Sequence, residues 1–347
     1  MKTYLITGGA GFIGSNFIKY MLKTYKDIKI INLDKLTYAG NINNLKSCKA
    51  DKRYNFVKGD ICDKVLVENI FKLNDIDYVV NFAAESHVDN SIKSALPFFE
   101  TNVMGCLNLI EMARKFWSDG EEYLPNKKFL QISTDEVYGS LELDSVEKFT
   151  EQTNINPHSP YSASKASADM LVKSFYDTHK LPINITRCSN NYGPFQFPEK
   201  LIPLIFTKCL KKQNLPVYGD GLNVRDWLFV EDHCRAIDLV LHNGKIGEIY
   251  NVGGGVEQPN IAIVKKIINF LHKFDNQITD ELITYVADRK GHDRRYSIDC
   301  SKLSKELGYK PMYDFNHAMD ETLTWYLNNK PWLENIVSGA YVNDNNA

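Results

Sequence analysis

Short apolar runs divide the first half of the chain at regular intervals, with more polar segments between them. The runs are TYLITGG, KIINLD, YNFVKGD, DYVVNFAA, KKFLQIST and PINITRC. Their hydrophobicity is continuous rather than alternating, which is typical of strands covered on both faces in a parallel sheet. The segments between them predict helices near residues 12–25, 63–73, 97–117 and 160–179. This alternation predicts a Rossmann-type, doubly wound α/β fold.

After about residue 190 the alternation gives way to loops rich in proline and glycine. They include NNYGPFQFPEKLIP, YGDGLNVRDW, NVGGGVEQPN and ADRKGHDRRYSID. Helices are predicted in this half near residues 231–243, 260–274 and 315–329. Long loops on a smaller lobe usually bind the variable part of a ligand. We therefore expect a smaller, mixed α/β lobe that binds a substrate.

The composition narrows the class of ligand. The 347 residues are 44% hydrophobic and 24% charged, and the formal net charge is −2. This balance gives no basic footprint for nucleic acid or an anionic membrane, so small molecules are the expected ligands. The apolar stretch before the first glycines is too short for a signal peptide, and no apolar run reaches the length of a membrane span. A cytoplasmic location is therefore expected.

Neither the cysteines nor the histidines indicate a metal site. The seven cysteines are scattered without a C-x-x-C pair, so we interpret them as reduced thiols. The eight histidines are dispersed, and none forms an H-x-x-x-H pair or joins an acidic cluster with ligand spacing. No metal is expected.

The segment TGGAGFIG lies between the first predicted strand and the first predicted helix. Gly8, Gly11 and Gly14 allow a tight turn and a close approach of the backbone to a pyrophosphate at the helix N-terminus. The next strand ends at Asp34, about twenty residues past Gly14, where a carboxylate accepts both ribose hydroxyls of adenosine. A carboxylate there repels an additional phosphate, so the sequence predicts NAD rather than NADP.

Residues at the ends of the later strands extend this cofactor site. Small or polar side chains there leave room for a flat cofactor. The further cofactor contacts that we expect are Phe12, Ile13, Lys35, Thr37, Asp60, Ile61, Ala83, Ala84, Tyr161 and Lys165. We expect residues 1–190 to form the NAD-binding domain and to carry the catalytic residues. Residues 191–338 then form mainly the substrate lobe, with some segments returning to the first domain, and residues 339–347 a flexible tail.

Two short segments carry candidate catalytic groups. In QISTDEVYGS, the fifth strand is followed by Thr134 and two adjacent carboxylates, Asp135 and Glu136. In YSASK, Tyr161 and Lys165 lie four residues apart, so in a helix both side chains leave the same face. A nearby ammonium, together with the positive ring of oxidised NAD, favours the phenolate and lowers the pKa of the tyrosine. Tyr161 is therefore a candidate base.

These motifs resemble those of a known family. The glycine turn, a serine or threonine after the fifth strand and Y-x-x-x-K are typical of the extended short-chain dehydrogenase/reductases. The blocks that narrow the resemblance to the nucleotide-sugar 4,6-dehydratases are STDEVYG, AAESHVD, YSASKASAD, RCSNNYGPFQFPEKLIP, GDGLNVRDWLFVEDH and DRKGHDRRYSID. The resemblance covers nearly the whole chain.

The resemblance implies a lyase that converts a nucleoside diphosphate glucose into the 4-keto-6-deoxy sugar and water. The substrate that it implies most directly is dTDP-glucose. NAD takes a hydride from carbon 4 and returns it at carbon 6. Tyr161 removes the hydroxyl proton at carbon 4, with Thr134 bonded to the same oxygen. Glu136 then acts as base at carbon 5, and protonated Asp135 donates to the departing hydroxyl at carbon 6. Adjacent carboxylates in one closed site titrate apart, as this elimination requires.

The resemblance also implies a substrate site and a dimer. Arginine suits the paired charges of a diphosphate, and the candidates are Arg225 and Arg289. The other substrate contacts that it implies are Ser86, His87, Asn190, Lys200, Leu201, Tyr218, Asn260, His292 and Tyr296. The family's counterparts of two amphipathic segments imply a homodimer through a four-helix bundle, and these segments are SIKSALPFFETNVMGCLNLIEMARKFW and SPYSASKASADMLVKSFYDTHK.

Three alternatives stay open. Lys290 stands where the family commonly has proline beside the nucleotide loop, so UDP-glucose is an alternative substrate. A nucleotide-sugar 4-epimerase has the same fold, although it has no need of paired acids. A noncatalytic NAD-binding redox sensor belongs to another class, and an intact set of Thr134, Tyr161 and Lys165 argues against it.

Overall fold

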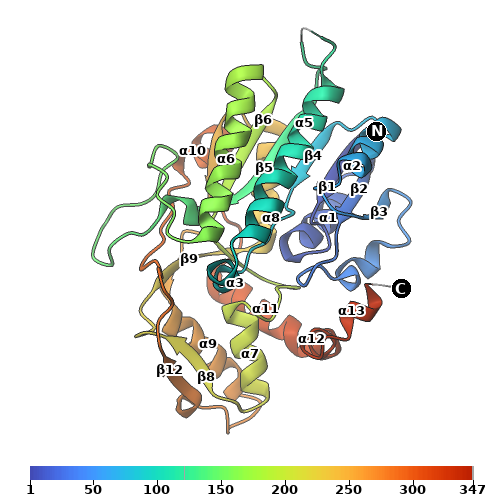
Figure 1. Cartoon of the computed structure of the whole chain (residues 1–347). Helices are drawn as coiled ribbons and strands as arrows, with labels where there is room; N and C mark the ends of the chain where they lie inside the picture. Colours follow the sequence, from blue (N-terminus) through green and yellow to red (C-terminus); the bar gives the residue numbers. More distant parts are fainter. Residues whose placement is uncertain (121, 346–347) are drawn as a thin grey trace.

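A sheet of seven parallel strands forms the centre of the protein, in the spatial order β10-β6-β5-β4-β1-β2-β3 (Figure 1). The structure is a computed structural model that describes residues 1–120 and 122–345. The strands are β1 (Lys2–Thr7), β2 (Ile28–Asp34), β3 (Tyr54–Lys58), β4 (Tyr78–Asn81), β5 (Lys128–Thr134), β6 (Ile183–Cys188) and β10 (Ile249–Val252). The order reverses between β1 and β4, which leaves a crevice at the carboxyl ends of the strands. The Rossmann-type fold is confirmed.

Helices cover both faces of this sheet (Figure 1). One face packs against α1 (Phe12–Thr24) and α8 (Val230–Asn243), and the other against α2 (Lys64–Leu73), α5 (Cys106–Trp117) and α6 (Pro160–His179). Alternate residues of β1 therefore enter different cores: Tyr4 and Ile6 pack on the first side, Leu5 on the second. This two-sided burial explains why the predicted strands are apolar at nearly every position.

The predicted helices are present, with one irregularity. The segment predicted near 97–117 consists of α4 (Leu96–Phe99), a π-helical turn over Glu100–Gly105, and then α5. A β-carbon on Gly105 would lie 2.5 Å from the side chain of Ile61. Glycine therefore lets this turn pack closely on the loop that follows β3, and π-helical turns of this kind often mark functional sites.

A smaller lobe lies below the carboxyl edge of the sheet (Figure 1). Its strands are β7 (Asn190–Tyr192), β8 (Leu215–Tyr218), β9 (Val224–Phe229), β11 (Glu257–Pro259) and β12 (Ile283–Val286). Its helices are α7 (Leu201–Leu210), α9 (Asn260–His272), α11 (Phe315–Asn328) and α12 (Lys330–Val337). The sequence analysis missed α7, because Pro203 interrupts its apolar run. Proline is tolerated in this position because it lies in the first turn of the helix.

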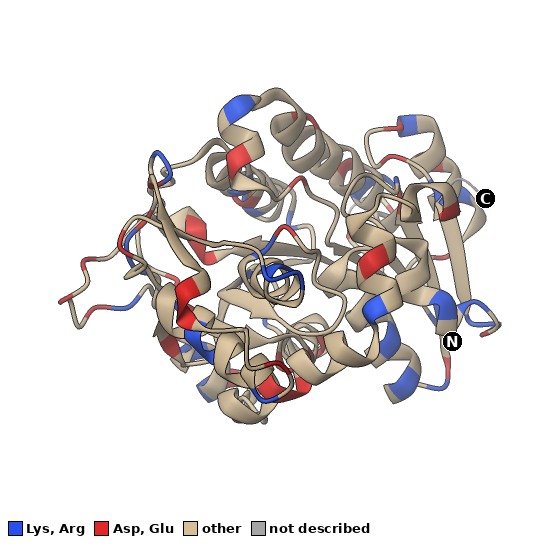
Figure 2. Cartoon of the chain, turned by 90° about the horizontal axis from the view of Figure 1, so that it is seen from below, with Lys and Arg blue, Asp and Glu red and all other residues tan. Residues whose placement is uncertain are grey.

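Short elements complete the chain. They are η1 (Ile42–Cys48), α3 (Val88–Lys93), η3 (Asp135–Tyr138), η4 (Asp280–Leu282), α10 (Ser301–Leu307) and α13 (Tyr341–Asp344). Charged residues of both signs are interspersed along the elements seen from below in Figure 2. Within residues 1–120 and 122–345, no helix is both long and apolar enough to cross a membrane.

The segment after Gly339 packs against the first domain over its described part. Helix α13 follows a turn at Gly339, and the Tyr341 side chain is buried. The Tyr341 hydroxyl donates to the carbonyl of Tyr38 at 2.5 Å, and the buried Asn345 amide donates to the carbonyl of Gly40 at 2.7 Å. The polar composition of NDNNA suggested disorder, but these side chains bond a loop far away in the sequence. Residues 346–347 lie outside the described part of the chain.

A buried ion pair joins the helix and the strand that border the candidate catalytic segments. Arg187 on β6 donates to Asp169 on α6 at 2.9 Å, and both side chains are almost fully buried. Arg187 also donates to the hydroxyl of Tyr138 at 3.0 Å, and that hydroxyl donates to Asn251 on β10 at 2.8 Å. The network therefore fixes the turn after β5 against α6 and two strands.

We predict that Arg187→Met destabilises the protein by roughly 3–5 kcal/mol, because it leaves Asp169 buried without its charge partner. The measurement is the midpoint of chemical unfolding. Lys173→Met is the matched control, since it breaks an exposed pair with Asp177 on the same helix and is expected to cost less than about 1 kcal/mol. Equal effects of the two substitutions would contradict the prediction.

Candidate active site

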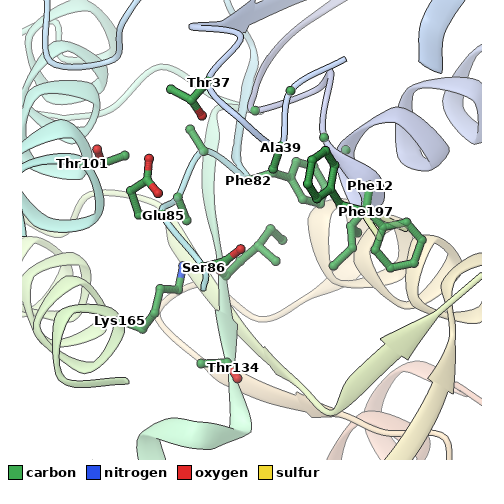
Figure 3. Close-up of a pocket in the computed structure, with 18 of the residues that line it drawn as sticks. Phe12, Thr37, Ala39, Phe82, Glu85, Ser86, Thr101, Thr134, Lys165 and Phe197 are labelled. Carbon is green, nitrogen blue, oxygen red and sulfur yellow. Dashed lines mark hydrogen bonds between the residues drawn. The ribbon is translucent and has the colours of Figure 1, made fainter. Parts of the chain in front are cut away.

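One pocket of about 310 Å³ opens at the carboxyl ends of the central strands. Its walls come from the glycine turn after β1, the ends of β2, β4, β5 and β6, helix α6, and the loop before α7. Figure 3 shows Thr134 and Lys165 at one side of this space and Phe12, Phe82 and Phe197 at another. A pocket at the reversal point of a parallel sheet is the usual ligand site of such folds.

The glycine turn is shaped for close contact with a ligand. Gly8 has φ +68°, and a β-carbon there would lie 2.6 Å from the backbone nitrogen of Ala83. A β-carbon on Gly14 would lie 2.5 Å from the carbonyl oxygen of Gly8. The turn therefore tolerates no side chain at either position, and helix α1 begins directly after it, at Phe12. This cradle fits a pyrophosphate at a helix N-terminus.

Asp34 lies at the end of β2 and faces the same pocket. One of its carboxylate oxygens accepts from the backbone N–H of Ala10 at 2.8 Å, and the other accepts from that of Leu36 at 2.7 Å. Each oxygen has further lone pairs for ribose hydroxyls. Burial raises the pKa of Asp34, and the two backbone donors act in the opposite direction.

All the residues predicted to contact the cofactor line this one pocket. They are Gly8, Gly11, Phe12, Ile13, Gly14, Asp34, Lys35, Thr37, Asp60, Ile61, Ala83, Ala84, Tyr161 and Lys165. Lys35 and Asp60 form an ion pair of 2.7 Å at its rim. The glycine turn can bind a pyrophosphate, and the carboxylate of Asp34 beside it can accept hydrogen bonds from a ribose. This site therefore fits a dinucleotide.

The predicted catalytic residues also line the pocket. Thr134 ends β5 and caps the 3-10 helix η3, because its hydroxyl accepts from the N–H of Glu136 at 3.2 Å. The same hydroxyl donates to Asp135 at 3.3 Å. This cap turns the two carboxylates out of the strand and into the pocket.

The two carboxylates have different surroundings. Burial, Glu136 and Asp226 raise the pKa of Asp135 well above its usual value. Its second oxygen is buried without a hydrogen-bond partner in the protein. Burial also raises the pKa of Glu136, but the positive charges of Lys200 and Arg225 oppose that rise. The pair therefore favours a proton on Asp135 and a charge on Glu136.

Tyr161 and Lys165 share the first turns of α6, which begins with a capping box at Ser159. The Lys165 ammonium donates to the carbonyl of Ile132 on β5 at 2.6 Å, which fixes the helix against the strand. Burial, followed by Glu136, raises the pKa of Tyr161 well above its usual value, whereas Thr134 acts in the opposite direction. The lowered pKa that the sequence analysis expected includes the positive ring of bound NAD, and it stays a prediction.

Of the predicted substrate contacts, Ser86, Asn190 and Lys200 line the pocket. The Lys200 ammonium donates to the carbonyl of Ser86 at 3.0 Å. The remaining candidates lie outside this lining and are His87, Leu201, Tyr218, Arg225, Asn260, Arg289, His292 and Tyr296. They belong mainly to the smaller lobe.

Part of this outer set forms a cluster beyond the pocket. Arg289 pairs with Asp89 at 2.5 Å and lies over the ring of Tyr218. The ring of Tyr218 also meets that of His292 edge to face. The pair between Asp89 and Arg289 joins α3 of the first domain to a loop of the smaller lobe. Lys290 beside it is exposed.

Arg225 and Tyr296 form a second group. The guanidinium of Arg225 lies 4.2 Å above the ring of Tyr296 and donates to the carbonyl of Asp293 at 2.9 Å. The hydroxyl of Tyr296 donates to the carboxylate of Asp293 at 2.6 Å. Arg225 lies on β9 of the smaller lobe. Its positive charge also acts on Asp135 and Glu136, where it opposes the rise of both pKa values.

The sequence analysis missed several lining residues. They include Phe82, Glu85, Thr101, Phe197 and Glu199. Glu85 follows the predicted strand-end alanines directly, so its position in AAESH was an available signal. Phe197 and Glu199 come from a loop whose path depends on packing against distant helices. Within the described residues, no group of three or more His, Cys, Asp and Glu side chains is placed to hold a metal ion.

The fold and the site define an extended short-chain dehydrogenase/reductase. Within this class the chain belongs to the GDP-mannose 4,6 dehydratase family, whose model matches residues 5–322. The resemblance to the nucleotide-sugar 4,6-dehydratases is thereby confirmed. A dTDP-glucose 4,6-dehydratase of Xanthomonas campestris pv. campestris (strain B100) is 50% identical over 98% of this chain and 97% of its own length.

Solved structures agree with this assignment. The dTDP-glucose 4,6-dehydratase of Bacillus anthracis str. Ames, in complex with NAD, is 49% identical and superposes with a TM-score of 0.87 over 97% of this chain and 100% of its own. The enzyme of the same name from Streptomyces venezuelae, also with NAD bound, is 44% identical, with a TM-score of 0.89 over 96% of this chain and 99% of its own.

Proposed function

We propose that this protein is an NAD-dependent dTDP-glucose 4,6-dehydratase, a hydro-lyase. It converts dTDP-glucose into dTDP-4-keto-6-deoxyglucose and water. The observation that carries the proposal is the placement of Asp135, Glu136 and Tyr161 in one pocket, beside a glycine turn shaped for a dinucleotide. Relatives of that activity with similar sequences along nearly the whole chain support it.

The cofactor is NAD. The glycine cradle would hold its pyrophosphate, and Asp34 would hold its adenosine ribose. When bound, NAD would supply the acceptor and donor of hydride for carbons 4 and 6, together with a positively charged ring. Burial and Glu136 raise the pKa of Tyr161, and that positive charge would oppose the rise.

Tyr161 and Thr134 act on the hydroxyl at carbon 4. The phenol of Tyr161 takes the proton of this hydroxyl, and Thr134 holds the oxygen. Lys165, fixed by the carbonyl of Ile132, stabilises the charge on the tyrosine from the same face of α6. A ketone at carbon 4 makes the proton on carbon 5 acidic.

Asp135 and Glu136 carry out the elimination. Glu136, whose pKa burial raises while Lys200 and Arg225 oppose the rise, removes the proton from carbon 5. Asp135, which burial and its carboxylate neighbours keep protonated, gives its proton to the hydroxyl that leaves carbon 6. Its unpartnered buried oxygen supports this role, since a substrate hydroxyl provides the missing partner. Reprotonation at carbon 5 then completes the product.

In this proposal the two lobes bind different ligands. Residues 1–190 hold NAD and the catalytic groups, and residues 191–338 mainly hold the nucleotide sugar. Arg225 and Arg289 face the diphosphate, since planar guanidinium groups pair well with phosphate oxygens. The other contacts proposed for the nucleotide sugar are Ser86, His87, Asn190, Lys200, Leu201, Tyr218, Asn260, His292 and Tyr296.

The proposal includes a homodimer built on α5, α6 and the neighbouring turns. Met104 and Met170 are 54% and 55% exposed on adjacent elements, which Asn102 and Ser164 join by a hydrogen bond of 2.8 Å. Exposed apolar side chains on neighbouring helices suit a second copy of the chain. The seven thiols are all free, and five of them are buried, which fits the reducing cytoplasm.

We expect purified protein to turn over dTDP-glucose without added NAD, or with only catalytic amounts, because the reaction returns its cofactor to the starting state. The measurement compares product formation from dTDP-glucose, UDP-glucose, CDP-glucose and GDP-mannose. Faster turnover of UDP-glucose would show that the preferred nucleobase is uracil rather than thymine. Product that keeps its oxygen at carbon 6 indicates a 4-epimerase. Stoichiometric release of NADH would refute the internal redox cycle, and NAD binding without any turnover would favour a sensor.

We predict that Glu136→Gln lowers product formation by about 10²–10⁴-fold, the usual contribution of a general base. Oxidation at carbon 4 continues, so reduced nicotinamide accumulates on the protein and is read by its absorbance after one addition of substrate. Glu142→Gln, an exposed carboxylate shortly after the catalytic turn, is the control and keeps normal turnover. Normal turnover in Glu136→Gln removes this residue from its role.

We predict that the double variant Met104→Glu and Met170→Glu is a monomer, because four carboxylates would have to be buried in the paired interface. Light scattering at several protein concentrations measures the mass. Met312→Glu is the control, since Met312 is 70% exposed on the smaller lobe. A wild-type protein that is monomeric at all concentrations would refute the proposed dimer.

A further inference from the structure

The last described segment of the chain packs onto a loop that borders the cofactor pocket. This loop, residues 35–44, follows Asp34, and four of its residues line the pocket: Lys35, Thr37, Ala39 and Gly40. The segment, residues 330–345, comprises α12 and α13 and the turn between them. Figure 1 shows α12 and α13 in red beneath the blue elements of the first domain. Nearly three hundred residues separate the two in sequence, so their contact is a tertiary feature.

The segment bonds the backbone of the loop directly. Asn345 is only 7% exposed, and its amide donates to the carbonyl of Gly40 at 2.7 Å. Its amide oxygen accepts from the N–H of Ile42 at 3.0 Å. The hydroxyl of Tyr341 donates to the carbonyl of Tyr38 at 2.5 Å. Three backbone groups of one loop are thus satisfied by two side chains of the segment.

Side chains strengthen the same contact. The indole N–H of Trp332 donates to Asn44 at 2.9 Å, and the amide of Asn43 donates to Asp344 at 2.8 Å. The ammonium of Lys58 on β3 donates to the carbonyl of Asn345 at 2.8 Å. The segment is therefore attached to the loop and to an edge strand of the sheet.

The other side of the loop is bonded to the glycine turn. The carbonyl of Ala10 accepts from the N–H of Asn41 at 3.1 Å and from the amide of Asn44 at 2.9 Å. Three aromatic rings that meet edge to face also join the loop to the segment. The ring centroids of Tyr38 and Phe197 lie 5.7 Å apart, and those of Phe197 and Tyr341 lie 6.0 Å apart. Phe197 itself lines the pocket.

We propose that residues 330–345 form a clasp that holds loop 35–44 closed over the adenosine half of the pocket and sets how slowly NAD leaves. This inference rests on the proposed function, since it takes NAD as the occupant. Loop 35–44 lies between the glycine turn and the segment, so the adenosine half opens only if these hydrogen bonds break. Retention is useful where each turnover restores the cofactor, because a departed NAD leaves the site inactive.

The test uses the full chain and two asparagines of the same segment. Asn345→Ala removes two hydrogen bonds to the loop, whereas Asn343→Ala changes an exposed side chain two residues away. Each protein is saturated with labelled NAD, and its release is followed after addition of excess unlabelled NAD. Release is expected to be about tenfold faster for Asn345→Ala, given the usual strength of such bonds, and unchanged for Asn343→Ala. Tyr341→Phe, which keeps the buried ring, is expected to accelerate release a few-fold.

The unfolding midpoint of each NAD-free variant distinguishes a local effect on NAD release from a general loss of structure. If Asn345→Ala does not fold, Tyr341→Phe takes its place in the release measurement. Midpoints close to that of Asn343→Ala together with faster release support the clasp. Release from both Asn345→Ala and Tyr341→Phe at the wild-type rate would overturn it. If the wild-type protein neither contains nor binds NAD, the proposed function fails instead.

Discussion

Under the proposed function, the chemistry depends on the removal of two adjacent carboxylates from water. Asp135 and Glu136 line a pocket where ionised groups are costly unless a charge or a hydrogen bond compensates them. Burial raises the pKa of both, but Lys200 and Arg225 oppose the rise at Glu136, whereas Glu136 and Asp226 add to the rise at Asp135. This difference suits the proposed roles of Asp135 as acid and Glu136 as base, although their side chains differ by a single methylene. A solvated loop with the same two residues would titrate them together.

The sheet and the smaller lobe make that asymmetry possible together. Thr134 ends a fully buried strand and caps the following turn, so the two acids enter the pocket at a fixed position. The charges that separate them come from outside this domain: Lys200 precedes α7, and Arg225 lies on β9. Neither lobe alone provides both the carboxylates and the cations. The proposed acid and base roles therefore require that the two lobes pack on one another.

Local patterns in the sequence predicted those strands and turns whose formation depends on neighbouring residues in the chain. Continuous apolar runs predicted six strands of the central sheet, because burial on both faces leaves no polar alternation. The glycine motif predicted the tight turn at Gly8, and the end of the second strand predicted the position of Asp34. The sequence analysis missed features that depend on distant partners. Helix α7 was hidden by Pro203, and Phe197 reaches the pocket through a loop that packs on remote helices. The segment near Asn345 has a polar composition typical of a flexible tail, and only its contact with Gly40 explains its order. The pKa of Tyr161 was expected to fall beside an ammonium and bound NAD, and in the chain alone burial and Glu136 raise it.

The contacts on the two sides of the pocket differ in strength. Loop 35–44, four of whose residues line the pocket, is bonded to the glycine turn on one side and to the segment 330–345 on the other. Arg289, a proposed substrate contact, pairs with Asp89 across the two lobes. A salt bridge between partly exposed side chains is weak, whereas a buried bond to a backbone group is costly to break. Under the proposed function, the contacts around the nucleotide sugar are therefore easier to rearrange than those that hold the loop beside the cofactor.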